Sequence, residues 1–490
     1  MTRCVMIQGV GSNVGKSVIV AGLCRALTRR GYRVRPFKPQ NMSNNAAAVA
    51  DGQEIGRAQH LQARACRVPA EVDMNPVLLK PETETGSQVI VHGHYLTTVQ
   101  PCEYTELKPA LRKDVLTSFY RLAANCDMII VEGAGSPAET NLRKNDIANM
   151  GFAREARVPV LLVGDIERGG VIAQLVGTQT VLESNDAKMI QGFLVNRFRG
   201  DINLFADGIK DIVQRTGWTS YGTIPWFDSM HWLPAEDAQD LSCKPGRFGD
   251  GRITCLVLSR IANFDDLDPL RMEPNLHVEL LESGHPLPAE TDIVIIPGSK
   301  STRGDLEFIR SNGWDIDILA HWRRGGRVLG ICGGYQMLGR MIRDPEGIEG
   351  NAGDSHGLGL LNVETIMQRE KQVREVTATL TADASTFPAY EIHIGNTEGE
   401  DTARPFAWIK TKDSLRPDGA ISADGRVEGT YLHGLFSDNQ FRQTWLKRQR
   451  MSTSDMNYGQ EIDSVLDLLA EHMETYVDID GIITMMRRIG

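Results

Sequence analysis

A glycine-rich turn near the start of the chain has the residues needed to hold phosphate groups. Gly9, Gly11 and Gly15 precede Lys16 and Ser17 in the run GVGSNVGKS, which follows an apolar stretch and leads into a helical pattern. Glycines let backbone N–H groups face an anion, the lysine brings a positive charge to the outer phosphates, and the serine hydroxyl can hold Mg²⁺. The spacing is one residue longer than G-x-x-x-x-G-K-[ST]. The turn therefore predicts binding of ATP with Mg²⁺.

A carboxylate is expected to complete this site. Glu132 follows the apolar run 128–131, where a buried carboxylate is costly unless it faces a cation or a cleft. We therefore predict Ser17 and Glu132 as the metal ligands. Asp165 ends the next apolar run, 160–164, in the same way and is a weaker candidate for the same ion.

A run of amides and a hydroxyl, KPQNMSNN, covers positions 38–45, just after a second apolar run. In open parallel sheets ligands bind at the carboxyl ends of the strands, so this loop is expected to face a substrate. On chemistry alone, an ordinary asparagine-rich turn explains the run equally well. The candidate substrate-binding residues are Lys38, Gln40, Asn41, Ser43 and Asn44.

One cysteine lies in a setting that suits a nucleophile. Cys332 stands in the run VLGICGGYQMLG at positions 328–339, which predicts a strand, a sharp turn and a helix. Small residues at Gly330 and Gly334 allow the tight turn, and the helix N-terminus lowers the pKa of a thiol. The backbone N–H of Gly333 is a predicted donor to an oxyanion. A buried structural cysteine is the alternative explanation.

A base and a second oxyanion donor come from two other segments. His433 follows a short apolar run in EGTYLHGLF, positions 428–436, where an imidazole can reach across a cleft. A backbone N–H at Gly298 or Ser299, after the apolar run ending at Ile296, is expected to be the second oxyanion donor, and we take Gly298 as the candidate. Alone, His433 would more often be a packed or surface histidine, so the assignment depends on the three segments together.

The elements that must position these residues alternate between strands and helices. Buried strands are predicted at 4–8, 34–37, 128–131, 160–163 and 192–195, with a helix at 17–30. Their continuous apolarity means that both sheet faces are covered, so the sheet should be mainly parallel. Residues 234–251 lose periodicity and gather Pro, Gly and charge. We expect a P-loop ATP-binding domain at 1–233 and a linker at 234–251.

A second α/β domain is predicted at 252–441. Strands are expected at 253–258, 293–296 and 328–331, with one helix at about 305–324. The fold class is thus α/β, with two mainly parallel sheets covered by helices on both faces. A helical tail at 442–490 contains an amphipathic helix from Ile462 to Tyr476, expected to pack onto its own domain.

Composition limits the class of protein. The chain has 490 residues and a net charge of −10, which lowers the expectation of nucleic-acid binding. The eight cysteines show no C-x-x-C pair, which favours a reduced, cytoplasmic protein without a structural metal. No apolar run is long enough for a membrane span. Whether copies of the chain form a homo-oligomer is left open by the sequence.

The motifs together carry a family resemblance. The longer phosphate turn resembles the dethiobiotin-synthetase-like branch of P-loop enzymes. The segments around Gly298, Cys332 and His433 resemble a class I (triad) glutamine amidotransferase domain, flavodoxin-like in fold, whose cysteine is acylated by glutamine and releases ammonia. That family usually has glutamate two residues after the histidine, where this chain has Leu435. The departure fits the cobyrinic and cobyric acid synthase branch and leaves no assigned carboxylate to orient His433.

Further matches to this branch are FKPQNMSNN at 37–45, VEGAG at 131–135 and YEIHIG at 390–395, in which Glu391 or His393 could assist the histidine. The resemblance implies the cobyric acid synthase family. It implies amidation of the b, d, e and g carboxylates of adenosylcobyrinic acid a,c-diamide in cobalamin biosynthesis, with glutamine, ATP and Mg²⁺. The corrinoid would lie on the asparagine-rich side of the ATP domain.

Two other functions compete with this one. The first is cobyrinic acid a,c-diamide synthesis, with the same domain order, against which the FKPQNMSNN loop argues. The second is a P-loop regulatory ATPase fused to an inactive amidotransferase-like module, against which the intact cysteine turn and His433 argue.

Overall fold

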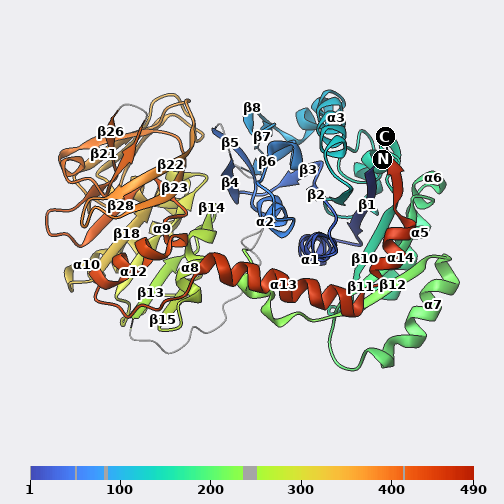
Figure 1. Cartoon of the computed structure of the whole chain (residues 1–490). Helices are drawn as coiled ribbons and strands as arrows, with labels where there is room; N and C mark the ends of the chain where they lie inside the picture. Colours follow the sequence, from blue (N-terminus) through green and yellow to red (C-terminus); the bar gives the residue numbers. More distant parts are fainter. Residues whose placement is uncertain (1, 50–51, 82–85, 235–250, 412–413, 490) are drawn as a thin grey trace.

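The computed structural model describes residues 2–49, 52–81, 86–234, 251–411 and 414–489. The chain forms two α/β units side by side, one blue to green and one yellow to orange (Figure 1). Each is built around a mainly parallel sheet, which confirms the predicted fold class. Apart from its two end residues, the predicted linker at 234–251 lies outside the described residues.

The first sheet has the strand order β12-β11-β10-β1-β9-β2, and all of these neighbours pair in parallel. Apart from the edge strand β12, its strands are buried along nearly their whole length, as their apolar runs predict. The strands are β1 (Thr2–Gly9), β2 (Val34–Phe37), β9 (Met128–Glu132), β10 (Val160–Asp165), β11 (Ile190–Phe198) and β12 (Thr219–Pro225).

Helices cover both faces of this sheet, because successive residues of a strand point to opposite sides. Met6 and Ile129 belong to one core with Phe119 of α3, while Val5 and Ile130 belong to the other core with α1 and α2. The helices are α1 (Lys16–Arg29), α2 (Arg57–Ala65), α3 (Pro101–Ala124), α4 (Met150–Glu155), α5 (Val171–Val181), α6 (Ser184–Ala187) and α7 (Ala206–Thr216).

Two small sheets extend the first unit toward the second. One has the order β3-β6-β7-β8 and the other is the β4-β5 hairpin. Their strands are β3 (Gln40–Met42), β4 (Ala46–Val49), β5 (Gln53–Gly56), β6 (Val77–Pro81), β7 (Ser87–Val91) and β8 (His94–Val99).

The second sheet has the order β15-β13-β16-β18-β28-β27, with only the β27 pairing antiparallel. Its five parallel strands run in the order 2-1-3-4-5, which is the flavodoxin-like arrangement. The strands are β13 (Gly251–Leu256), β15 (Leu276–Leu281), β16 (Ile293–Ile296), β18 (Arg327–Ile331), β27 (Ala420–Ile421) and β28 (Val427–Thr430).

The helices of this unit are α8 (Asp268–Met272), α9 (Thr302–Ser311), α10 (Trp314–Arg323), α11 (Gly333–Leu338) and α12 (Asn439–Arg448). The prediction of one helix at 305–324 was wrong. Gly313, at φ 72°, separates α9 from α10, and this left-handed backbone conformation ends a helix.

Further strands in the second unit were not predicted. One sheet has the order β20-β19-β21-β24 and another β26-β25-β22-β23-β29, while β14 pairs with β17. Several of them alternate buried and exposed residues, so they lack the continuous apolar runs used to find strands. They are β14 (Ile261–Ala262), β17 (Gly298–Ser299), β19 (Met341–Asp344), β20 (Gly353–His356), β21 (Val363–Ile366), β22 (Gln372–Leu380), β23 (Thr386–His393), β24 (Asn396–Gly399), β25 (Ala407–Lys410), β26 (Leu415–Asp418) and β29 (Leu432–His433).

The C-terminal tail returns to the first unit. Helix α13 (Tyr458–Tyr476) packs on α1, and α14 (Ile479–Met485) leads into β30 (Arg487–Ile489), which pairs antiparallel with β1 (Figure 1). The expectation that this helix packs onto its own domain was wrong. Its apolar face fits α1 closely, since a Cβ atom at Gly22 would lie 2.7 Å from Cγ of Met473.

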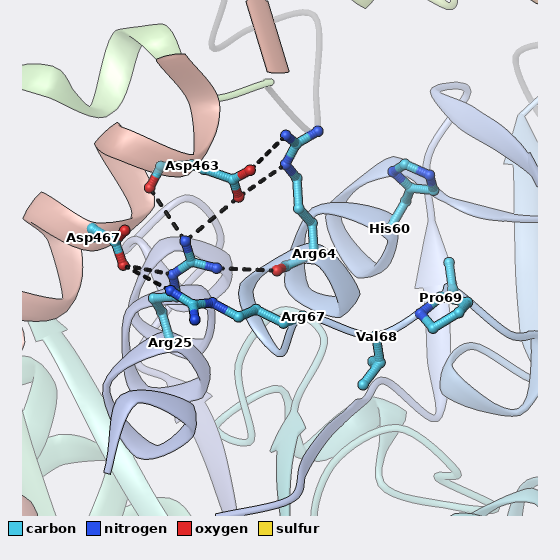
Figure 2. Close-up of a pocket in the computed structure, with 9 residues that line it drawn as sticks. Arg25, His60, Arg64, Arg67, Val68, Pro69, Asp463 and Asp467 are labelled. Carbon is cyan, nitrogen blue, oxygen red and sulfur yellow. Dashed lines mark hydrogen bonds and ion pairs between the residues drawn. The ribbon is translucent and has the colours of Figure 1, made fainter. Parts of the chain in front are cut away.

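Ion pairs extend this helix contact to the surface. Figure 2 shows the arginines of α1 and α2 meeting two aspartates of α13 at a surface pocket. Nε of Arg25 lies 2.8 Å from Asp467, and Arg64 lies 2.8 Å from Asp463. The side chain of Arg25 is only 2% exposed, so these contacts are part of the packing between α1 and α13.

Candidate functional site

The glycine-rich turn lies between β1 and α1, at the carboxyl end of the central strand of the first sheet. Gly15 has φ 92°, and a Cβ atom there would lie 2.3 Å from Nδ2 of Asn196. A Cβ atom at Gly9 would lie 2.5 Å from the side chain of Val14. Gly11 lies between them and accepts a hydrogen bond at 3.0 Å through its carbonyl from Nζ of Lys16. Gly9 and Gly15 therefore allow the close approach of this turn to its surroundings.

Lys16 is held across the mouth of the turn. Besides Gly11, its Nζ donates to the carbonyl of Gly135 at 3.2 Å, in the loop after β9. The ammonium is therefore already placed where phosphates bound by the backbone N–H groups would meet it.

Glu132 collects three donors at the end of β9 and is 1% exposed. Its Oε1 accepts from Ser17 Oγ at 2.8 Å and from Lys38 Nζ at 2.8 Å, and its Oε2 accepts from Gln62 Nε2 at 2.6 Å. Lys38 arrives here because β2 is the neighbour of β9 in the sheet. A hydroxyl and a carboxylate are the hard oxygen donors that Mg²⁺ prefers, so Ser17 and Glu132 suit a metal between them.

Asp165 lies apart from this cluster. It ends β10, on the other side of β1, and its Oδ2 lies 3.1 Å from Arg197. Within the described part of the chain, no group of three or more His, Cys, Asp or Glu side chains could hold a metal ion. A metal here would therefore depend on Ser17 and Glu132, with phosphate oxygens and water as further ligands.

The amide loop at 38–44 runs from one site toward the other. Lys38 lies at Glu132, while Gln40 accepts from the hydroxyl of Tyr104 at 2.6 Å. Asn41 and Ser43 are buried within the first unit, where Asn41 donates to Gln59 at 2.9 Å. Asn44 reaches a pocket in the second unit that also contains Cys332.

Three neighbouring strands of the second sheet bring together the cysteine, the histidine and the glycine predicted from the sequence. Gly298 follows β16, Cys332 follows β18 and His433 follows β28. Register pairs Ile296 with Gly330, and Ile331 with Thr430, so the three residues emerge at one edge. Together with Gly333 they line one pocket, which we call the Cys332 pocket; it also contains Asn44 and Lys80 of the first unit, and Lys300, Gln336, Lys371 and His393.

The turn that carries Cys332 is strained, as a nucleophile turn requires. Cys332 itself has φ 53° and ψ −108°. A Cβ atom at Gly334 would lie 2.0 Å from the carbonyl oxygen of Ile296, so only glycine fits beneath the turn. Gly333 directly follows Cys332 and begins α11, where its backbone N–H is not bonded within the helix. Positive φ at a non-glycine residue is characteristic of such sites.

His433 is oriented by a carboxylate that the sequence analysis missed. Its Nδ1 lies 2.7 Å from Oδ2 of Asp266, whose Oδ1 accepts from the N–H of Gly434 at 2.6 Å. Asp266 lies in the 3-10 turn η7 (Phe264–Leu267), after β13, the next strand of the same sheet. The only sequence signal for this carboxylate was the acidic run FDDLD at 264–268, which follows the strand predicted at 253–258.

The surroundings of His433 favour its charged form. Burial by itself would lower the pKa of His433, but the Asp266 carboxylate and the Cys332 thiol group outweigh it and raise the pKa to about 10. Nε2 is buried and makes no hydrogen bond to the described residues. A protonated imidazole beside a thiolate is the resting pair of many cysteine nucleophiles.

Glu391 and His393 have other partners. Glu391 pairs with Arg416 and lies 3.7 Å from His393, and the ring of His393 stacks on Tyr431 at 3.8 Å. Neither makes a hydrogen bond to His433 among the described residues. His393 lines the pocket, while Glu391 lies on the same strand, β23, and is paired with Arg416.

No helix in the described ranges is both long and apolar enough to cross a membrane.

Two family models match the chain. Residues 5–239 match a CobQ/CobB/MinD/ParA nucleotide binding domain, and residues 252–441 match a CobB/CobQ-like glutamine amidotransferase domain.

Full-length relatives are also found. A cobyric acid synthase of Bradyrhizobium diazoefficiens is 58% identical over 489 residues, which cover 99% of this chain and 100% of that protein. One from Rhodobacter capsulatus is 59% identical and covers 98% of this chain and 99% of that protein. One from Paracoccus denitrificans is 58% identical with the same coverage. With a nucleotide-binding domain and an amidotransferase domain in one chain, and this identity over nearly its whole length, the chain belongs to the cobyric acid synthase family.

Proposed function

We propose that this chain is an ATP- and glutamine-dependent carbon-nitrogen ligase that converts adenosylcobyrinic acid a,c-diamide into cobyric acid. It would amidate the b, d, e and g carboxylates in cobalamin biosynthesis. The observation that carries the reaction type is the Cys332–His433–Asp266 arrangement in the same chain as the Lys16–Glu132 phosphate site. Membership of the family supports the choice of corrinoid.

Glutamine hydrolysis would occur in the Cys332 pocket. The thiolate attacks the side-chain amide carbon, and the N–H groups of Gly298 and Gly333 stabilise the oxyanion that forms. The His433 imidazolium gives its proton to the departing nitrogen, which leaves as ammonia. Water then hydrolyses the thioester, with His433 as the base, and releases glutamate.

Carboxylate activation would occur at the glycine-rich turn. The N–H groups of 9–17 and Lys16 hold the ATP phosphates while a substrate carboxylate oxygen attacks the γ-phosphorus. This forms an acyl phosphate and releases ADP; ammonia then attacks the carbonyl carbon and inorganic phosphate leaves. Mg²⁺ held by Ser17 and Glu132 would neutralise charge on the phosphates.

The amide loop supports a protected route for ammonia between the sites. Its first residue, Lys38, contacts Glu132, and Asn44 lines the Cys332 pocket. Seven residues span at most about 25 Å, so the loop connects two nearby sites. Oδ1 of Asn44 is buried without a hydrogen-bond partner among the described residues, and it suits an ammonia molecule leaving the pocket.

The same loop is our proposed contact with the corrinoid. Lys38 and Gln40 lie at its phosphate-site end, where an activated carboxylate must be held. Asn41, Ser43 and Asn44 are the other proposed corrinoid-binding residues of this loop. The lysine is a local positive charge for a substrate with several carboxylates, whereas the net charge of the chain is negative.

We further propose an amide synthase domain at 1–233, an amidotransferase domain at 252–441 and a tail at 442–490. The two model matches, at 5–239 and 252–441, support this division. A cytoplasmic location is supported by the absence of disulfides among the seven cysteines described.

Mass spectrometry of the products tests this function. The purified chain is incubated with ATP, Mg²⁺, glutamine and either adenosylcobyrinic acid or its a,c-diamide, and amidations per molecule are counted. Four amidations of the a,c-diamide are expected. Amidation of the acid at positions a and c alone would identify a diamide synthase, and ATP hydrolysis without glutamine hydrolysis would identify a regulatory ATPase.

A further inference from the structure

Arg57 of the first unit reaches into the second unit beside the catalytic histidine. It is the first residue of α2, which lies at the boundary between the two units (Figure 1). Its guanidinium pairs with Asp265 and donates to the hydroxyl of Tyr390 at 2.7 Å. The side chains of Arg57 and Asp265 are 11% and 9% exposed, so this ion pair is largely shielded from water.

Of the two partners of Arg57, Tyr390 contacts His433 directly and Asp265 is the chain neighbour of a residue that does. Asp265 precedes Asp266, which accepts from Nδ1 of His433. Tyr390 lies directly opposite His433 in the β23–β29 pairing, and its ring stacks on the imidazole at 5.4 Å with 19° between the planes. The Arg57 guanidinium of the first unit therefore contacts Asp265, the neighbour of the Asp266 carboxylate, and Tyr390, whose ring packs on the face of the His433 imidazole.

We propose that Arg57 is a positioning residue for glutamine hydrolysis, holding His433 and Asp266 in working geometry through Asp265 and Tyr390. The proposal rests on the function proposed above. Without Arg57, the buried carboxylate of Asp265 would lose the guanidinium paired with it while still lying next to Asp266, and both acidic residues of the turn would be held less firmly. The glutaminase base is thus complete only when the two units are docked.

Farther along α2, a second side chain contacts the phosphate site, so this helix connects the two sites. One and a half turns after Arg57, Nε2 of Gln62 donates to Oε2 of Glu132 at 2.6 Å and to the carbonyl of Ser17 at 3.3 Å. A single short helix therefore contacts both the phosphate site and the neighbours of the catalytic histidine. Ammonia would be released only where the synthetase site is in place to receive it.

Asn263 of the second unit adds hydrogen bonds to the contact between the two units around Arg57. Asn263, at φ 52° before the acidic turn, donates to the carbonyl of Ala46 at 2.7 Å and to the hydroxyl of Tyr390 at 3.2 Å. The turn that carries Asp265 and Asp266 therefore has two contacts with the first unit, one from Asn263 just before it and one from Asp265 within it, and Arg57 supplies the charged contact.

The test compares Arg57→Ala, Arg57→Lys and the control Arg64→Ala in the full chain. Arg64 lies on the same helix but pairs with Asp463 of α13. Initial rates give kcat and KM for glutamine hydrolysis. Alkylation by iodoacetamide, followed peptide by peptide, gives the reactivity of Cys332, with exposed Cys102 of α3 as the internal reference.

For Arg57→Ala we expect kcat to fall at least tenfold with KM for glutamine within twofold, because Arg57 does not line the Cys332 pocket. Alkylation of Cys332 should slow relative to Cys102, and ammonium-supported synthesis should stay within twofold of wild type. Arg57→Lys should recover most of kcat, because it keeps a charge beside Asp265. Arg64→Ala should hydrolyse glutamine at the wild-type rate.

An unchanged kcat in Arg57→Ala, an equal fall in Arg64→Ala, or a change confined to KM would overturn the proposal. If Arg57→Ala does not fold, Tyr390→Phe removes only the hydroxyl, and a fall in kcat of threefold or more supports the positioning role while an unchanged kcat rejects it. A wild-type chain that neither hydrolyses glutamine nor shows a reactive Cys332 would instead refute the proposed function.

Discussion

Asp266 Oδ2 lies 2.7 Å from His433 Nδ1, although 167 residues separate the two in the chain. The position two residues after the histidine, where related amidotransferases have a glutamate, holds Leu435, which is fully buried in the core. His433 therefore still has a carboxylate partner, although none lies two residues after it. This carboxylate comes from the loop after β13, at the same edge of the sheet.

Replacing this carboxylate tests its role. Asp266→Asn keeps the shape but removes the charge that orients and stabilises the imidazolium, so we expect kcat for glutamine hydrolysis to fall about 100-fold or more. Steady-state glutaminase assays measure it, with ammonium-supported synthesis as the control for folding. Activity within a few-fold of wild type would mean that Asp266 does not serve His433.

The pH dependence follows from the same pair. The pKa of His433, about 10 in the folded chain, lies above its usual 6.5. Stability from this proton is therefore fully present below about pH 6.5 and is lost as the pH rises through 10. We expect kcat/KM for glutamine hydrolysis to fall on the alkaline side near pH 10 in the wild type. In Asp266→Asn this fall should come at lower pH, because the negative charge that raises the pKa of His433 is removed. An alkaline limb that does not move would contradict this origin of the shift.

Cys332→Ser separates the two half-reactions. A serine hydroxyl at this turn is a far weaker nucleophile than a thiolate, so glutamine-dependent synthesis should be lost while ammonium salts still support it. Product formation with each nitrogen source measures the difference. Equal loss with both sources would remove the ammonia-donor role of Cys332.

Lys16→Ala should have the complementary effect. Loss of the ammonium that bridges Gly11 and Gly135 removes the charge facing the phosphates, so synthesis should fall at least 100-fold from either nitrogen source. Some glutamine hydrolysis should remain. The matched control is Lys210→Ala on α7, whose side chain is 78% exposed; near-normal amidation by Lys16→Ala would refute the phosphate-loop role.

The tail helix should stabilise the first unit. Leu469 of α13 is fully buried against α1, so Leu469→Ala should lower the free energy of unfolding by about 2–5 kcal/mol. Its neighbour Leu468 is half exposed, and Leu468→Ala should change stability by about 0.5 kcal/mol or less. Urea unfolding measures both variants. Equal effects would show that the α1–α13 contact contributes little.

Much of the fold could be predicted because its signals are local. Apolar runs indicated the strand that ends at Glu132 and the strands that end just before Gly298 and Cys332, and continuous apolarity indicated parallel sheets. The strands from β19 to β26 were not predicted, because several of them alternate buried and exposed residues, which gives a weaker signal in a single sequence.

The sequence by itself determined where the phosphate turn and the cysteine turn lie and suggested the chemistry we propose for them, since each is a short run of glycines around one reactive side chain. Only the tertiary structure decided which carboxylate holds His433, which unit receives α13 and that Arg57 touches the neighbours of the base. These relationships depend on strand order and on the docking of two units. No local pattern records them, because a side chain's partner across a sheet edge or an interface is chosen by packing of the whole chain.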